Sequence, residues 1–279
     1  MASPAGGLGA LGSVGSVGSV GGLGALATAP AWATPRVAPR AESPAVGVDH
    51  ALVDSGLTAR WGQAMRRDLG WAARWTPLPS GVLLKVLAAG DIDMGIHLSQ
   101  PLADRWAKEG MIHDRHVLGR TDVLLLGPAQ DTAGIRGETD PARVLRQVLA
   151  ADAAGAARWQ APPVDSALAA WLASLGALAP PRATSAPAPQ AEQLPYRLIT
   201  RAEWLAEQAR PSPRQAGPGP RIWLQGSASA PRALSLACEV ARPFRVRHPG
   251  ARLLAQWLQG PLGRQAVRAM APAWQAAQG

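Results

Sequence analysis

Residues 79–99, PSGVLLKVLAAGDIDMGIHLS, decide the fold because they join two elements of different period. Apolar residues at helical spacing in 82–87 follow a Ser80-Gly81 pair, which is typical of a helix N-terminus. In residues 92–98, apolar residues alternate with polar or small ones, and this alternation predicts a half-buried strand. A helix that passes directly into a strand indicates an α/β unit.

The same pattern continues on both sides of this unit, with strands and helices alternating along the chain. We therefore expect α/β layers around a mainly parallel sheet. The expected strands lie at 71–79, 92–98, 121–128 and 221–226, and two more begin the segments 46–57 and 195–209, which then turn into helices. The expected helices lie at 57–69, 82–90, 101–112, 140–151, 165–178 and 251–270, the last divided at Gly260-Pro261, and a further helix ends the segment 195–209.

The net charge of +9 favours a protein that attracts anions through its overall field. Lys and Arg residues are scattered, with local density only in 242–252, whereas nucleic-acid binders concentrate them in a patch with interleaved aromatic residues. We therefore expect no nucleic-acid partner. No stretch is long and apolar enough, without Gly and Pro, to predict a transmembrane helix.

Residues 1–45 are of low complexity, with the repeat GSVGSVGSVGG, and cannot bury enough apolar surface to offset the entropy of ordering. The tripeptides at 27–29 and 31–33 fit the small-x-small cleavage pattern of a secretory leader. However, no Lys or Arg occurs before Arg36, so the positive n-region of a leader is missing. Two interpretations stay open. The segment is an atypical leader for export to the periplasm, which we favour, or a disordered extension or misassigned start of a cytoplasmic protein.

The sequence contains no recognisable arrangement for catalysis or metal binding. It lacks a nucleophile–base motif, a glycine-rich phosphate loop and zinc-type spacing. His97, His113 and His116 share no ligand spacing with a Cys or carboxylate cluster, and we interpret them as solvated or structural. The lone cysteine, Cys238, lies among apolar neighbours and is predicted to be a small buried residue. We expect no enzyme activity, no cofactor and no metal.

Six blocks of the chain resemble, in order, the periplasmic substrate-binding proteins of ABC transporters for tungstate and related oxyanions. The longest block, KEGMIHDRHVLGRTDVLLLGPAQDTAGIRG at 108–137, is similar to the family in length and in nearly every punctuating residue. The other blocks are DSGL (54–57), SG (80–81), AAGDIDMGIHLS (88–99), YRLITRAEWLA (196–206) and RVRHPGARLLAQWLQGPLGRQAV (245–267).

The resemblance implies a type II periplasmic-binding-protein fold, in which two α/β lobes close around a ligand in a central cleft. It implies one lobe formed by residues 46–125 and 240–279, and a second lobe formed by residues 126–239. It also implies a small anionic solute, and a monomer that docks in its closed form on a permease in the membrane.

The family's ligand-binding signature is largely absent from this chain. Its opening Thr and Ser residues correspond to residues 48–51, VDHA, and an ionised Asp49 would repel a poorly solvated anion by about several kcal/mol. Its second ligand loop corresponds to 157–171, where Arg158 alone matches and two prolines replace backbone donors. Its Gly-rich third segment corresponds to 183–192, which is rich in Pro and Ala. We expect the fold to transfer from the family, but not the tungstate ligand set.

Four residues are candidate contacts for an anion, and each also has a simpler interpretation. Ser80, Gly81 and Ser55 could present hydroxyl or backbone donors to an anion, or could only begin or cap helices. Arg158 could hold an oxyanion through two hydrogen bonds, or could be one of many surface arginines.

Asp49 and His50 are the two candidates that suit other ligands. Together they could hold a metal or bind a cationic or hydrogen-bond-donating ligand, or they could mark a site that has lost its ligand. The leading function is an extracytoplasmic solute-binding protein of an ABC importer, with a small anion (tungstate-like, molybdate-like or diverged) as solute. Two alternatives stay open: a sensor or scaffold of the same fold that has lost oxyanion binding, and an effector domain of a cytoplasmic regulator.

Overall fold

The computed structural model describes residues 43–176, 194–210, 219–225, 233–241 and 248–277. Residues 1–42 of the predicted low-complexity segment 1–45 lie outside these ranges, and so does the Pro-rich segment at 183–192, whereas Ala45 already belongs to the first strand. Contacts divide the chain into residues 1–41 and residues 42–279, and every described element belongs to the second unit. No described helix is long and apolar enough to cross a membrane.

The described elements alternate much as the sequence predicts. The helices are α1 (His50–Asp54), α2 (Leu57–Leu69), α3 (Ser80–Ala89), α4 (Gln100–Lys108), α5 (Pro141–Ala153), α6 (Ala167–Ser174), α7 (Arg201–Ala209), α8 (His248–Gln259) and α9 (Pro261–Arg268). The strands are β1 (Ala45–Asp49), β2 (Arg74–Leu78), β3 (Met94–His97), β4 (Ile112–Gly127), β5 (Trp159–Gln160), β6 (Tyr196–Thr200), β7 (Arg221–Gln225), β8 (Ala233–Ala241) and β9 (Gln275–Ala276).

The strands form a mixed sheet in the order β2-β1-β3-β8-β4-β6-β5, with β7 and β9 also paired to β4. Strand β1 is parallel to β2 and β3, and β5 is parallel to β6. All five remaining pairings are antiparallel, and four of them involve β4. The expectation of a mainly parallel sheet is therefore wrong. The sequence pattern does not show that β4 and β8, which lie far apart in the chain, pair antiparallel with each other.

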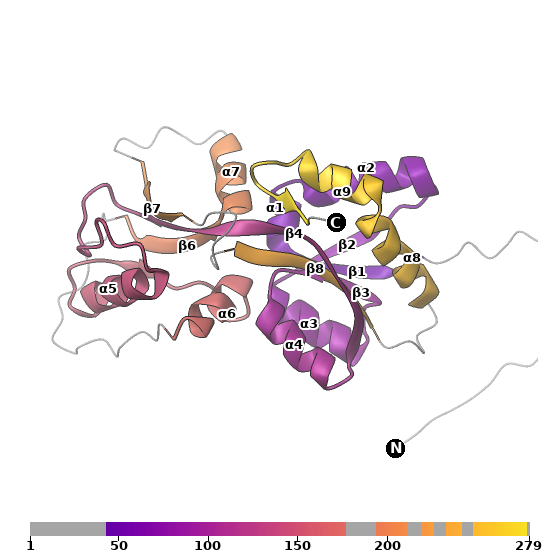
Figure 1. The fold of residues 1–279 in the computed structure, drawn as a ribbon, viewed down its shortest axis with the longest axis horizontal. Coiled ribbons are helices and arrows are strands. Elements are labelled where there is room, and N and C mark those ends of the chain that lie inside the picture. Colours follow the sequence, from indigo (N-terminus) through magenta and orange to yellow (C-terminus); the bar gives the residue numbers. More distant parts are fainter. Residues whose placement is uncertain (1–42, 177–193, 211–218, 226–232, 242–247, 278–279) are drawn as a thin grey trace, which may run out of the picture. The chain divides into compact units, whose positions relative to one another are not determined.

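Strand β4 is shared by two groups of strands. The first part of β4 pairs with β8, and we call β1, β2, β3 and β8 the first group. The last part of β4 pairs with β6 and β7, and we call β5, β6 and β7 the second group. Figure 1 shows α3 and α4 on one side of the first group, α2, α8 and α9 on its other side, and α5 and α6 beside the second group. The two groups therefore each form a layered α/β body along one continuous strand.

The segment 79–99 forms the helix and strand that its pattern predicts, but the strand is buried on both faces. Helix α3 ends at Gly90, whose φ of 81° favours glycine. All four residues of β3 are buried, so the expectation of a half-buried strand is wrong. The reason is close packing of α3, because a Cβ on Gly95 would lie 2.5 Å from Leu83 Cδ2.

Candidate functional site

A cavity of about 150 Å³ lies where elements of both strand groups meet. The end of β1, the start of α1 and Pro79 border it from the first group. The start of α6 and the first turn of α7, with Thr200 and Glu203, border it from the second group. We call this space the central cavity. It lies at the carboxyl ends of β1 and β3, the position at which open α/β sheets bind ligands.

Asp49 connects the cavity to the helix starts of the first group. It follows β1 directly, and its Oδ1 accepts a hydrogen bond from the backbone N–H of Ala51 at 3.0 Å, which caps α1. Its Oδ2 accepts a hydrogen bond from the Ser80 hydroxyl at 2.5 Å. Burial raises the pKa of Asp49, although these two hydrogen bonds and the nearby His50 and His97 lower it.

Ser80 and Gly81 already have partners within the protein. The Ser80 side chain is fully buried, donates to Asp49 and accepts from the backbone N–H of Leu98 at 3.1 Å. The backbone N–H of Gly81 donates to the carbonyl oxygen of Asp165 at 2.7 Å. A Cβ on Gly81 would lie 2.8 Å from that oxygen, so only glycine permits this approach. The first turn of α3 is therefore closed by acceptors of the chain itself.

An ion pair accompanies the contact at Asp165. Lys85 Nζ on α3 lies 2.9 Å from Asp165 Oδ1, just before α6. Both side chains are largely exposed, so the pair contributes little to stability. It borders an apolar cavity of about 550 Å³ between α4 and α6, which Gly81 and Trp106 also line. Asp165 thus joins the two strand groups through its backbone and its side chain.

Glu203 is the second carboxylate of the central cavity. Its Oε2 accepts hydrogen bonds from the backbone N–H and hydroxyl of Thr200 at 3.0 and 2.7 Å, and it completes the capping box of α7. Burial raises the pKa of Glu203, and the charges of Asp49 and Asp54 raise it further. The charge of Asp49 therefore opposes the ionisation of Glu203 across the cavity.

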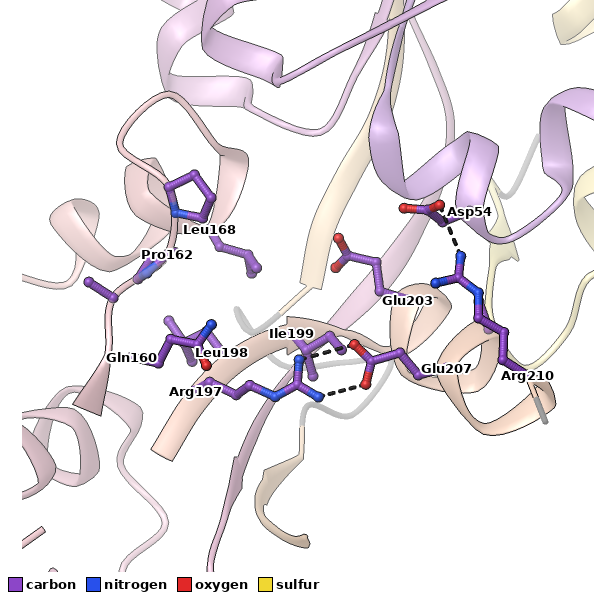
Figure 2. Close-up of a pocket in the computed structure, with 13 residues that line it drawn as sticks. Asp54, Gln160, Pro162, Leu168, Arg197, Leu198, Ile199, Glu203, Glu207 and Arg210 are labelled. Atoms are coloured by element: carbon purple, nitrogen blue, oxygen red, sulfur yellow. Dashed lines mark hydrogen bonds and ion pairs between the residues drawn. The ribbon is translucent and has the colours of Figure 1, made fainter. Parts of the chain in front are cut away.

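A second cavity of about 210 Å³ shares Glu203, Pro163 and Leu168 with the central cavity. Figure 2 shows its charged residues in pairs, with Arg197 beside Glu207 and Arg210 beside Asp54. Arg197 binds Glu207 through two hydrogen bonds of 3.0 and 2.6 Å. Arg210 Nη2 lies 3.1 Å from Asp54 Oδ1. Both arginines are thus already bound to carboxylates, whereas Glu203 has no arginine partner among the described residues.

A buried cluster of charged residues lies close to Asp49 within the first group. Glu239 on β8 is fully buried, and its Oε1 accepts from Arg115 Nε and lies 3.3 Å from His97 Nε2. Arg115 also donates to Asp104 on α4. Within the described ranges, His97 Nδ1, Arg115 Nη2 and Glu239 Oε2 are buried without a hydrogen-bond partner. The interpretation of His97 as structural agrees with this position inside the sheet.

The structure brings four of the predicted site residues together. Asp49 and His50 line the central cavity, Ser80 lies directly behind Asp49, and Gly81 lies beside it at the contact with Asp165. No group of three His, Cys, Asp or Glu residues in the described part of the chain is placed to hold a metal.

Ser55 and Arg158 lie elsewhere and line none of these cavities. The Ser55 hydroxyl donates to the carbonyl of Leu52 at 3.3 Å and accepts from Trp274 Nε1 at 2.9 Å. Arg158 is exposed just before β5, and its carbonyl oxygen accepts from the backbone N–H of Tyr196 at 2.7 Å.

Sequence reasoning missed Thr200 and Glu203 as residues of the site. A local signal was present, because Thr followed three residues later by Glu is the capping-box pattern. That pattern predicts only a helix start. Nothing in it indicates that α7 begins opposite Asp49.

Comparison of the sequence with protein-family models and with curated proteins finds no match. Comparison of the structure with solved structures finds clear similarity. A periplasmic protein that has been suggested to bind metal matches with a TM-score of 0.68 and 19% identity, over 85% of this chain and 97% of that chain. The tungstate ABC transporter protein of Geobacter sulfurreducens matches with a TM-score of 0.64 and 19% identity, over 82% and 98%. The tungstate-binding protein TupA of Desulfovibrio alaskensis G20 matches with a TM-score of 0.62 and 18% identity, over 85% and 99%.

These similarities confirm the predicted fold class. The chain has the type II periplasmic-binding-protein fold, and the resemblance noted in the sequence is confirmed as a likeness of fold. Sequence identities below 20% leave the ligand to be argued from the site itself.

Proposed function

We propose that the chain is an extracytoplasmic solute-binding protein of an ABC importer. The observation that carries the proposal is the central cavity, because residues of both strand groups line it. Asp49 and Pro79 come from the first group, and Ser166 and Glu203 come from the second. Movement of one group against the other would open or enclose a solute there. The tungstate transport and binding proteins with the same fold support the importer context.

In this proposal the two lobes have the limits that the resemblance implies, residues 46–125 and 240–279 in one and residues 126–239 in the other, except that all of β8 (Ala233–Ala241) belongs with the first group, where it pairs with β3. The boundary near 125 falls within β4, where pairing changes from β8 to β6 between Asp122 and Val123. The closed form docks as a monomer on a membrane permease. The place of action is the periplasm, with the N-terminal segment as its leader.

A ligand screen by thermal unfolding tests the solute-binding function. A solute that binds only the folded protein raises the unfolding midpoint with concentration. The screen contains tungstate, molybdate, sulfate and phosphate, amino acids, organic amines and divalent metals. Ala167→Leu is the matched variant, because Ala167 is buried at the cavity wall and a larger side chain there fills the space. A true cavity ligand shifts the midpoint of the wild type and not of the variant. A screen without any shift contradicts the proposal.

Fractionation tests the place of action. The proposal predicts a mature protein in the periplasmic fraction that has lost its N-terminal segment. Full-length protein confined to the cytoplasm would instead favour the effector domain of a cytoplasmic regulator.

A second candidate is a sensor or scaffold that has lost oxyanion binding. The observation that favours it is the use of the Ser80 hydroxyl and the Gly81 N–H by Asp49 and Asp165. A bare oxyanion needs several convergent donors, and these two already have acceptors. The candidates differ in one measurable respect. The importer protein releases its solute to a permease reconstituted in vesicles, and the sensor does not.

A further inference from the structure

We infer that the central cavity binds its solute through an ammonium or guanidinium group, with Asp49 and Glu203 as the acceptors. This inference rests on the proposed solute-binding function and names the chemical class of the solute. It follows from four properties of the cavity: its donors, its acceptors, its charge and its walls.

Donors of four residues at or beside the cavity are engaged within the chain. The Ser80 hydroxyl donates to Asp49 Oδ2, and the Ala51 N–H donates to Asp49 Oδ1. The Gly81 N–H donates to the Asp165 carbonyl. The Thr200 hydroxyl and N–H donate to Glu203. An anionic solute would have to displace one of these acceptors before it could gain a hydrogen bond there.

The carboxylate acceptors of the cavity are engaged less fully than these donors. Asp49 is only 8% exposed and lines the cavity, and each carboxylate oxygen can accept more than the one hydrogen bond it has. At Glu203, every hydrogen bond from the described residues reaches Oε2, which leaves Oε1 free to accept. Figure 2 shows the Glu203 side chain extending from α7 into the space between Leu168 and Asp54. The cavity therefore offers carboxylate oxygens to a ligand that brings N–H donors.

The charge balance around the cavity favours a cation. Arg197 and Arg210 are the arginines of the adjoining cavity, and each already pairs with another carboxylate, Glu207 or Asp54. Asp49 and Glu203 have no such partner among the described residues, apart from the imidazole groups near Asp49. A bound ammonium group would supply the missing positive charge to both carboxylates.

The walls limit the solute to a small molecule with a short apolar part. Ala51, Leu98, Ala167 and Leu168 line the cavity together with Pro79 and Pro163. A volume of about 150 Å³ is small for an organic ligand site. Leu168 and Glu203 line the second cavity as well, which places it next to the central cavity. Short alkylamines and guanidines have these features.

The experiment compares four probes on the full-length chain: putrescine, agmatine, tungstate and molybdate. Thermal unfolding and calorimetric titration are run at constant ionic strength, set with sodium chloride, so that general screening does not imitate binding. We expect putrescine or agmatine at millimolar concentration to raise the unfolding midpoint, and we expect tungstate and molybdate to leave it unchanged.

Two variants locate the binding. Glu203→Gln keeps the oxygen that caps α7 and removes the charge, and Asp49→Asn keeps the oxygen that caps α1. Each is expected to raise the Kd of the amine by about ten- to a hundredfold, the range for one charge-assisted hydrogen bond. Glu109→Gln is the matched control. It removes an exposed carboxylate just after α4, which is paired with Arg105, and leaves the Kd unchanged.

Each outcome separates the inference from the function on which it rests. Amine binding that weakens in both variants supports the inference. Binding of tungstate or molybdate that is lost in Ser80→Ala overturns the inference and leaves the solute-binding function intact. Amine binding with the same Kd in both variants also overturns it, because the amine then binds elsewhere. If no solute of the wider screen stabilises the chain, both the inference and the solute-binding function are refuted.

Discussion

Substitution of Glu239 tests the buried charged cluster of the first group. Glu239→Ala removes the acceptor that Arg115 Nε and His97 Nε2 share, inside a site where Glu239 has no exposed surface. Breaking a fully buried ion pair on one side destabilises a protein by about 3–5 kcal/mol. We expect about 2–3 kcal/mol here, because Arg115 is 22% exposed and keeps Asp104 as a partner. Glu239→Gln keeps an acceptor oxygen and loses only the charge. Its expected cost is about 1–2 kcal/mol, the difference between charged and neutral hydrogen bonds.

The assay is urea unfolding followed by tryptophan fluorescence, which the 11 tryptophans of the chain make possible. A double-mutant cycle isolates the pair. Arg115→Met keeps the apolar stem of a side chain that is 22% exposed and also bound to Asp104. If the pair is coupled, Glu239→Ala with Arg115→Met costs less than the sum of the two single variants by about 1 kcal/mol or more. Glu109→Gln, an exposed change on the neighbouring helix, stays within about 0.5 kcal/mol of the wild type.

Two results would refute this reasoning. One is a cost of less than about 1 kcal/mol for Glu239→Ala, below the cost expected for the loss of a buried hydrogen bond to a charged group. The other is strict additivity of the two substitutions, which would mean that Glu239 and Arg115 do not stabilise each other.

Three further substitutions test individual residues of the site. Because burial raises the pKa of Asp49 above its unfolded value, this carboxyl contributes stability at acid pH that is lost as the pH rises through the folded pKa. From acid to neutral pH, the thermal midpoint of Asp49→Asn should therefore rise relative to that of the wild type. A difference in midpoint that does not change with pH would contradict the raised pKa. Gly81→Ala places a Cβ 2.8 Å from the Asp165 oxygen, so it should cost about 1–3 kcal/mol in urea unfolding and weaken solute binding in calorimetry; unchanged values would show that this contact is absent. Ser55→Ala leaves Trp274 Nε1 without its acceptor and should cost about 1–3 kcal/mol with no change in solute Kd, whereas a weaker Kd at unchanged stability would make Ser55 a ligand residue.

Local signals allowed most of the fold to be predicted. Helix α3 could be placed because its start at Ser80 and its end at Gly90 are marked by neighbouring residues. Helix α5 could be placed because Asp140 caps it and Pro141 opens its first turn. The burial and the pairing of the strands could be predicted less well from the sequence. The length of β4 and its antiparallel pairing with β8 depend on residues far apart in the chain, and so does the covering of Gly95 by α3.

The site could be predicted only in part, for the same reason. Asp49 and Ser80 could be singled out as unusual residues at an element boundary, but the sequence does not show that they bind each other. Whether a hydroxyl or N–H is free to bind a solute depends on what lies opposite it. For Gly81 the opposite group is the carbonyl of Asp165, and for Asp49 the opposite carboxylate is Glu203. No periodicity or spacing connects these pairs.

The sharing of β4 by both strand groups has a mechanical consequence. Asp122 pairs with Ala233 of β8, and Val123, the next residue, pairs with Thr200 of β6. Arg201 holds Asp122 by an ion pair of 2.8 Å at the same point. There is thus no unpaired pivot in β4 at this crossing. Rotation of one strand group against the other must therefore twist the hydrogen-bonded strand β4. Opening of the central cavity then meets an elastic resistance that a flexible loop between the groups would not supply.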